Sequence, residues 1–478
     1  MSKRNTGILL ILLTAFGSGC TKWLDVQPKD KFTEEQVFAD MTSAATALNG
    51  IYLHLASAPL YGNYLTLSTI EILAQRYNIG ATHSRTIYQN YQYAESAVMG
   101  NFESSWVAAY ALVVNANEYV KNLDKYKGNY SAQADSIMRG EAIGLRAMMH
   151  FDMLRMFGPI CNTKDSVAKS IPYYRKAQPE IAELLPANQV IDSVLDDLKL
   201  AESYLQNDPV RYQGVVLAQQ NDGLDFWRNR NLRMNYFAVK ALQARVHLYR
   251  NNKAAAYESA RSVVEEGSKW FPWINPSRVM SDRANPDRIF SSELIFALFN
   301  INLYATNRDL FAPEVQESSI LAPNDTRLKA LYESNENDYR YNPSWALATT
   351  GGKAYKTFFK YTDVLSPDSP ARYKMPMLRM SELYYIMAEC ETDAAKGRAL
   401  INTVRKNRGL TDLAATAVVN TELQKEYQKE FYGEGQLFFY YKRRNVTSIP
   451  NSAATSGNVT MNAAKYVIPL PLSETQYR

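Results

Sequence analysis

Three glutamates near the carboxyl end form the sharpest acidic set in the chain. Glu426, Glu430 and Glu434 follow one another at intervals of four residues, which places them on one face of a helix. A glycosidase instead needs two carboxylates on opposite sides of the bond that it cleaves. Because Lys425 and Lys429 stand beside the row, we interpret it as a solvated or salt-bridged surface and not as a catalytic pair.

The four histidines give no sign of a metal site or a catalytic site. They stand at positions 54, 83, 150 and 247, and none has another histidine at ligand spacing. The sequence has no H-E-x-x-H motif, no P-loop, no G-x-S-x-G elbow and no complete dinucleotide fingerprint. We therefore predict a protein without enzymatic activity, metal or cofactor. A polysaccharide-degrading enzyme on a helical scaffold stays open, because folding can bring scattered acids and tyrosines together.

A cysteine at position 20 closes a segment with the layout of a secretory signal. Lys3 and Arg4 precede an apolar run of about nine residues, which is too short to span a bilayer. Small residues follow, and a cysteine directly after them is the lipid acceptor of a bacterial lipoprotein. We predict that residues 1–19 are a signal peptide and that Cys20 is the lipidated first mature residue. The alternative is an ordinary signal peptide with an incidental cysteine.

The charge of the chain is close to balance. Without residues 1–19, 51 basic residues stand against 48 acidic ones, and the densest basic spot is the short run Lys442-Arg443-Arg444. This is no footprint for nucleic acid. Cys161 and Cys390 lie far apart and belong to no C-x-x-C pair. We favour two buried free thiols, although a disulfide is also permitted outside the cytoplasm.

Helical periodicity dominates the body of the chain after an extended tether at 20–31. Thr33 and Gln36 have the spacing of a capping box. Apolar residues at helical spacing predict helices over 33–55, 102–123, 141–157, 190–205, 235–249, 255–266, 380–390 and 394–408. The last four form two hairpins of the kind that tetratricopeptide-type repeats stack. Irregular stretches cover 59–100, 206–232, 268–375 and 445–478, with short strands expected at 293–299 and 356–361.

These elements predict a mainly α fold. We expect an irregular, tetratricopeptide-like scaffold of helical hairpins that carries a loop-rich ligand-binding face and a few short strands. Residues 32–478 are predicted to form one body, in which 32–267 is the helical-repeat part and 268–478 is the loop-rich and C-terminal helical part. Long loops in compact domains are usually functional, so we expect the ligand on that face.

Several short motifs follow one another along the chain in an order typical of one known family. They are C-x-x-x-L-D-x-x-P at 20–28, N-G-I-Y at 49–52, G-E-A-x-x-L-R-A at 140–147, the stretch from M-L-R at 377–379 to R-G at 408–409, and E-F-x-G-E-G at 430–435. In these motifs the chain resembles the SusD/RagB family of outer-membrane nutrient-binding lipoproteins of the Bacteroidetes, from Cys20 to its end. It departs from the family pattern at Leu437 and Tyr440, which replace the usual Arg and Asp.

The resemblance implies a function and a partner. The partner is a SusC-like TonB-dependent transporter of the outer membrane, on which the lipoprotein sits as a lid. Known ligands of the family are mostly oligosaccharides, with peptides in some members. We therefore predict a non-catalytic, lipid-anchored and surface-exposed protein that captures a nutrient, most simply an oligosaccharide, and delivers it to this transporter. A peptide-binding member of the family and a protein-interaction scaffold are the alternatives.

Aromatic and amide side chains in the irregular stretches are the candidates for ligand binding. The chain has 33 tyrosines, which outnumber the 18 phenylalanines and 6 tryptophans together. Tyrosine presents a flat apolar face while its hydroxyl stays hydrated, and such a face stacks on a sugar ring. The alternative for each ring is packing within its loop. Two stretches combine these rings with hydrogen-bonding groups, and their candidates are Tyr61, Tyr64, Gln75, Arg76, Tyr77, Tyr88, Asn90 and Tyr91 in the first and Tyr304, Asn307, Arg308 and Trp345 in the second.

Overall fold

The computed structural model of the chain describes residues 32–161, 164–178, 180–216 and 225–478. The predicted signal peptide, the predicted tether and Cys20 therefore lie outside the described residues. The described part is mainly α, with four small two-stranded sheets. None of its helices combines the length and the apolar character that crossing a membrane requires. The predicted fold class is confirmed.

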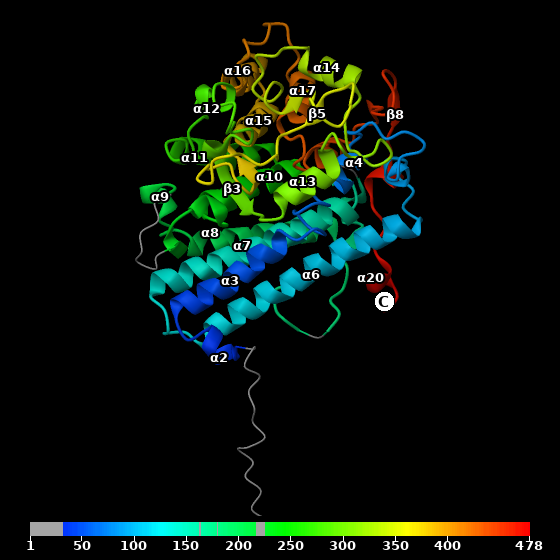
Figure 1. Ribbon diagram of the computed structural model, residues 1–478. Helices are drawn as coiled ribbons and strands as arrows, with labels where there is room; N and C mark the ends of the chain where they lie inside the picture. Colours follow the sequence, from blue (N-terminus) through cyan, green and yellow to red (C-terminus); the bar gives the residue numbers. More distant parts are fainter. Residues whose placement is uncertain (1–31, 162–163, 179, 217–224) are drawn as a thin grey trace, which may run out of the picture.

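Long helices form the lower part of the molecule in Figure 1. They are α3 (Met41–Leu55), α6 (Ser96–Lys125), α7 (Ala132–Phe157) and α8 (Ala187–Tyr204), preceded by the short α2 (Glu34–Val37). The predicted capping box is present, because Thr33 and Gln36 each accept a hydrogen bond from the other's backbone N–H. Asp40 caps a second helix start, which divides the predicted helix 33–55 into α2 and α3. Helix α7 packs between α6 and α8.

Glycine allows α7 to approach its neighbours closely. A Cβ atom at Gly140 would lie 2.6 Å from Cγ of Leu205, and one at Gly144 would lie 2.7 Å from Cγ of Met234. Contacts this short force the neighbour to shift, so the α7 surface needs glycine at both positions. The other end of α7 is held by Lys442, whose Nζ donates to three carbonyl oxygens at residues 155, 156 and 158.

Two helical hairpins continue the scaffold, as the sequence predicts. The first pairs α10 (Tyr236–Tyr249) with α11 (Lys253–Gly267), and the second pairs α15 (Met380–Cys390) with α16 (Ala394–Lys406). Helix α11 also packs against α15, so the hairpins stack although more than 100 residues separate them. Ala241 and Ala244 of α10 are almost completely buried.

The irregular stretches contain more short elements than the sequence predicts. The helices of these stretches are α4 (Thr69–Leu73), α5 (Thr86–Gln89), α9 (Val210–Gln213), α12 (Pro276–Met280), α13 (Leu303–Phe311), α14 (Asp325–Tyr332), α19 (Ala463–Tyr466) and α20 (Leu472–Thr475). Two more helices, α17 (Val419–Glu430) and α18 (Leu437–Arg443), lie between the second hairpin and the last irregular stretch. Short 3-10 helices cover Lys164–Val167, Asp225–Trp227, Arg230–Leu232 and Ser291–Glu293.

All four strand pairs are antiparallel. They are β1 (Lys169–Ile171) with β2 (Leu185–Pro186), β3 (Leu294–Phe299) with β6 (Lys374–Arg379), β4 (Trp345–Ala346) with β5 (Thr357–Phe358), and β7 (Ser448–Pro450) with β8 (Asn458–Thr460). The strand predicted at 293–299 is present as β3. The strand predicted at 356–361 shrinks to the two residues of β5.

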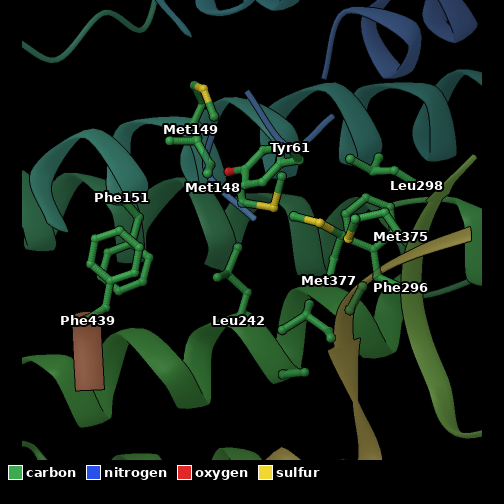
Figure 2. Close-up of a cluster of buried hydrophobic side chains, with 14 of the residues drawn as sticks. Tyr61, Met148, Met149, Phe151, Leu242, Phe296, Leu298, Met375, Met377 and Phe439 are labelled. Atoms are coloured by element: carbon green, nitrogen blue, oxygen red, sulfur yellow. The ribbon is translucent and has the colours of Figure 1, made fainter. Parts of the chain in front are cut away.

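One large hydrophobic core joins the two halves of the chain. It extends from Phe38 to Ile468, and a small separate cluster forms around Ile274. Figure 2 shows its centre, where Met148 from α7, Leu242 from α10 and Met377 from β6 lie together. Because elements from both halves of the chain contribute to this core, the loop-rich side is firmly packed against the helical scaffold. Cys161 and Cys390 are both free and partly buried, so they form no disulfide with each other.

Candidate functional site

The loop-rich side is assembled from segments that are far apart in sequence. They are the stretch before α6, the connection between α13 and α14, and the hairpin of β7 and β8. The backbone N–H of Asn78 donates to the carbonyl of Ala322 at 2.7 Å, which joins the first segment to the second. Nε2 of Gln89 donates to Oγ of Ser452 at 3.0 Å, which joins the first to the third. The three segments therefore form one surface.

Two neighbouring cavities open on this surface and share Gln75 as a wall. The first has a volume of about 250 Å³, and its polar and aromatic lining residues include Gln75, Arg76, Asn324, Arg327, Lys425, Gln428, Tyr432, Tyr441 and Ser452. The second has a volume of about 450 Å³, and the corresponding residues are Gln75, Thr86, Gln89, Asn90, Tyr91, Asn451 and Lys465. We call the two cavities together the Gln75 cleft. A cleft lined by amides, hydroxyls and tyrosines suits a ligand rich in hydroxyl groups.

A network of amide hydrogen bonds fixes the wall between the two cavities. Nε2 of Gln75 donates to the carbonyl of Gln89 at 3.0 Å and to the hydroxyl of Tyr91 at 3.2 Å. In return, Nε2 of Gln89 donates to Oε1 of Gln75 at 3.1 Å. The Tyr91 hydroxyl donates to the carbonyl of Leu73 at 2.8 Å. Each member of the wall thus restrains the next, so the cleft exists before a ligand arrives.

Gln75 and Tyr91 both have left-handed backbones. Their φ angles are 56° and 57°, in a region that residues other than glycine seldom occupy. Such strain persists only where the surrounding structure over-determines it, and it gathers at ligand-binding sites. The two strained residues are hydrogen-bonded to each other in the wall of the cleft, which makes this the strongest candidate site of the loop-rich side.

Arg76 is held rigidly at the edge of the cleft. Its guanidinium lies 3.9 Å above the ring centroid of Tyr432, and its Nε lies 3.2 Å from the carboxylate of Glu71. Glu71 also accepts hydrogen bonds from the backbone N–H groups of Gly433 and Gly435, at 3.2 and 2.8 Å. The pKa of Glu71 is raised above its ordinary value, because burial outweighs the opposing effects of Arg76 and the two N–H groups. The carboxylate thus anchors the segment after α17 beneath the cleft.

A separate cavity of about 560 Å³ lies beside α13. Tyr304, Asn307 and Arg308 line it, together with Glu314, Asp363 and other residues of the β4–β5 region. We call it the Tyr304 cavity. Oδ1 of Asn307 is buried and has no hydrogen-bond partner among the described residues, so this acceptor is available to a donor. One cation, Arg308, and two carboxylates, Glu314 and Asp363, line this cavity, so the charged groups of its lining carry a net negative charge.

The structure separates the sequence-predicted ligand residues into four groups. Gln75, Arg76, Asn90 and Tyr91 line the Gln75 cleft, and Tyr304, Asn307 and Arg308 line the Tyr304 cavity. Tyr64 and Tyr88 are half-buried and line neither. Tyr61, Tyr77 and Trp345 are at most 2% exposed and belong to the hydrophobic core.

The three core aromatics are withdrawn from the predicted binding surface. The Tyr61 hydroxyl donates to the carboxylate of Asp152 at 2.5 Å, and the Tyr77 hydroxyl donates to a backbone carbonyl at 2.6 Å. Trp345 packs against Phe358 with ring centroids 4.6 Å apart. These buried rings present no face to a ligand, because the long loops fold back and cover them. The predicted alternative, packing within the loop, applies to them.

Sequence reasoning missed the part of the cleft that comes from later segments. Arg327 belongs to α14, while Asn451 and Ser452 follow β7 and Lys465 belongs to α19. Each stands more than 200 residues from Gln75 in the chain. No local pattern marks these residues, since only the fold brings them to the cleft.

The glutamate row near the carboxyl end is salt-bridged, as predicted, but it is not at the surface. Glu426, Glu430 and Glu434 are at most 4% exposed. Glu430 lies 2.6 Å from Nη2 of Arg408 and 3.3 Å from Nη1 of Arg340. Together with Glu293, Asp338, Lys360, Arg379 and Arg405, which pair with them, these residues form what we call the Glu430 cluster.

The Glu430 cluster is built for structure and not for proton transfer. Burial opposes the ionised form of Glu430, but Arg408, Arg340 and Arg379 hold its pKa below the ordinary value. At Glu426 burial likewise opposes ionisation, but Arg340, Lys429 and Arg405 together lower its pKa. A general acid would need the opposite shift. Burial does raise the pKa of Glu293, but both of its carboxylate oxygens accept hydrogen bonds from Arg408. Within the described ranges, no three His, Cys, Asp or Glu side chains stand together in a way that could hold a metal ion.

Comparisons with known proteins agree with this architecture. A family described as starch-binding and associating with the outer membrane matches residues 22–219, and the SusD family matches residues 304–471. The two matches together take in more than half of the 478 residues. A search of curated proteins found no match.

Solved structures share the fold over most of the chain. A SusD superfamily protein of Bacteroides thetaiotaomicron is 18% identical, with a TM-score of 0.70 over 91% of this chain and 98% of its own. A putative sugar-binding protein of Bacteroides vulgatus is 17% identical, with a TM-score of 0.67 over 91% and 96%. A laminarin-binding SusD-like protein is 17% identical, with a TM-score of 0.65 over 91% and 97%.

The fold and the cleft together define a helical-repeat scaffold that carries a preformed cleft on its loop-rich side. The matched segments lie in both halves of the chain, and the shared fold spans nearly all of it. The chain belongs to the SusD/RagB family.

Proposed function

We propose that this protein is a non-catalytic nutrient-binding lipoprotein that captures an oligosaccharide in the Gln75 cleft. The observation that carries the proposal is the hydrogen-bonded wall of the cleft, in which Gln75 and Tyr91 keep left-handed backbones. The wall keeps the cleft open, and the exposed amide of Asn90 beside it can donate to and accept from sugar hydroxyls, while the ring of Tyr91 offers an apolar edge. The names of two relatives of the same fold, a putative sugar-binding protein and a laminarin-binding protein, support this ligand class.

Family membership supports the rest of the proposal. The lipidated Cys20 anchors the protein in the outer membrane, facing the cell exterior, after the signal peptide 1–19 is removed. The body, residues 32–478, then binds the ligand and passes it to a SusC-like TonB-dependent transporter. A lipid-anchored binder cannot by itself move cargo across a membrane, so the proposal includes this partner.

Calorimetric titration with a panel of oligosaccharides tests the binding site. Asn90→Ala removes an exposed amide of the cleft and should weaken binding about 2–10-fold, the value of one hydrogen bond. Tyr304→Ala probes the other cavity, and Asn115→Ala, on the exposed face of α6, is the matched control. If Tyr304→Ala weakens binding and Asn90→Ala does not, the ligand site is the Tyr304 cavity. A peptide panel in the same assay tests the alternative ligand.

Three further measurements address the remaining parts of the proposal. Cys20→Ala should release the protein from the outer membrane or leave it uncleaved. Purification from native membranes should recover a large TonB-dependent barrel with the protein. A bound polysaccharide should yield no new reducing ends, and clear product release would make the chain an enzyme instead.

A further inference from the structure

The Gln75 cleft is lined by basic side chains and by no acidic ones. Arg76, Arg327 and Lys425 line its first cavity, and Lys465 lines its second. Among the described residues that line either cavity, none is Asp or Glu. The Tyr304 cavity differs, since Glu314 and Asp363 line it beside its one arginine. The excess of positive charge is therefore a property of the cleft and not of the chain, whose net charge is only +5.

Two of the four cations lack a carboxylate partner. Arg76 is paired with Glu71, and Lys425 lies 3.0 Å from Glu422. Arg327, by contrast, donates from Nε to the carbonyl of Ala454 at 3.0 Å and from Nη2 to that of Gly457.

Lys465 is held in the same way. Its Nζ donates to the carbonyl of Thr460 at 2.7 Å and lies 5.3 Å from the ring centroid of Tyr91. In the part of the chain that the structure describes, neither Arg327 nor Lys465 has a carboxylate oxygen within 4.0 Å.

Backbone carbonyls orient these two cations without neutralising them. All three acceptors lie between Ala454 and Thr460, in the hairpin of β7 and β8. A guanidinium that is fixed in position and not neutralised is suited to bind an anion through charge-assisted hydrogen bonds. The nearest acid on α14 is Asp325 in its first turn, and its carboxylate is paired with Lys329 at 2.6 Å.

We infer that the ligand of the Gln75 cleft is an anionic oligosaccharide, whose carboxylate or sulfate groups pair with Arg327 in one cavity and with Lys465 in the other. The inference rests on the proposed function and adds the chemical class of the ligand. The amide wall at Gln75 stands between the two cations, so a ligand that reaches both carries charges on at least two of its sugar units. The exposed amide of Asn90, beside the wall, is then available for hydroxyl groups of the same ligand.

Pairs of ligands that differ only in charge test the inference. Tetragalacturonate and its methyl ester form the carboxylate arm, and a carrageenan tetrasaccharide and its desulfated counterpart form the sulfate arm. In at least one arm, the charged ligand should bind about 10-fold more tightly or better than its neutral partner. Its affinity should also fall as NaCl rises, because salt screens charge pairs in a solvated cleft.

Variants that remove one positive charge show which side chains cause the preference for the charged ligand. Arg327→Gln and Lys465→Gln should each weaken binding of the charged ligand about 10-fold or more and change binding of its neutral partner less than twofold. Lys329→Gln is the matched control, because it removes a cation two residues from Arg327 that lines neither cavity. Thermal melts of all three variants show whether each is folded.

The outcomes separate the inference from the proposed function. If neutral oligosaccharides bind as tightly as charged ones, and Asn90→Ala weakens them, the inference is overturned while the proposed function stands. The same holds if Arg327→Gln and Lys465→Gln leave the charged ligand unaffected. If no oligosaccharide binds and an acidic peptide such as tetraglutamate does, both are overturned.

Discussion

Replacing Glu430 by glutamine removes one charge from the centre of the Glu430 cluster and keeps the shape of the side chain. The carboxylate lies 2.6 Å from Nη2 of Arg408 and 3.4 Å from Nη1 of Arg379, and it also accepts from Oγ of Ser381 at 2.8 Å. In the variant, an amide group turns one N–H donor toward these guanidinium groups. Removing one partner of a buried ion pair costs about 3–5 kcal/mol, because the charge left behind stays buried without its partner.

The expected change in melting temperature follows from the size of the folded part. The structure describes about 440 residues, and unfolding releases about 2.1 cal/mol/K of entropy per residue. A loss of about 3–5 kcal/mol therefore lowers Tm by about 3–5 °C. Differential scanning calorimetry of residues 21–478 at pH 7 measures this shift.

A surface variant supplies the control for this measurement. Glu265 lies 2.8 Å from Nη1 of Arg261, and both side chains are well exposed. Glu265→Gln removes the same charge in the same way, and its Tm should equal that of the parent protein, since exposed pairs contribute little. If Glu430→Gln also melts within about 1 °C of the parent, or above it, the row of glutamates does not hold the scaffold together.

Three other outcomes are expected. Gly435→Ala should lower Tm by more than Glu430→Gln does, or prevent folding, because its φ is 69° and an added Cβ would lie within 2 Å of the Leu65 carbonyl oxygen. The free energy of unfolding at 25 °C should fall as pH drops below about 4.5, because the pKa of Glu430 is lower in the folded chain than in the unfolded one, so that protonation favours unfolding. Urea titrations from pH 7 to pH 3 measure this free energy. A value that does not change over this range would contradict the prediction. Cys161 and Cys390 should react slowly with iodoacetamide at pH 8 and quickly in urea, because burial raises their pKa values to about 11 and about 12; equally fast labelling in both conditions would speak against their burial.

The scaffold follows from the sequence because its signals are local. Helical periodicity and caps such as Thr33 and Asn235 lie within a few residues of the elements that they define. Strand β6 was missed because Pro376 stands in its middle, and proline usually argues against a strand. The β3–β6 sheet has only two strands, so each is an edge and tolerates the missing N–H donor.

The site follows from the sequence only in part. The sequence predicts ligand binding in the stretch that holds Gln75, Asn90 and Tyr91, because this polar and aromatic stretch lacks helical periodicity. The sequence does not show that Tyr77 is buried, because a tyrosine ring can pack in a hydrophobic core or bind a ligand at the surface. The same limit applies to the glutamate row, because spacing defines a helix face but not what covers it. The arginine nearest to the Glu430 carboxylate is Arg408, at 2.6 Å, and it follows a different helix, α16, in the chain.

The hydrogen bonds between Glu71 and the glycines after α17 constrain when the molecule can fold. The carboxylate of Glu71 is fully buried, and the N–H group of Gly433, which satisfies it, follows 362 residues later in the chain. At a synthesis rate of about 5–20 residues per second, the two groups leave the ribosome about 20–70 s apart. Until then, closing the first half would bury Glu71 with Arg76 but without its two backbone N–H donors, which is costly. The nascent chain therefore stays open until nearly all of it has been made.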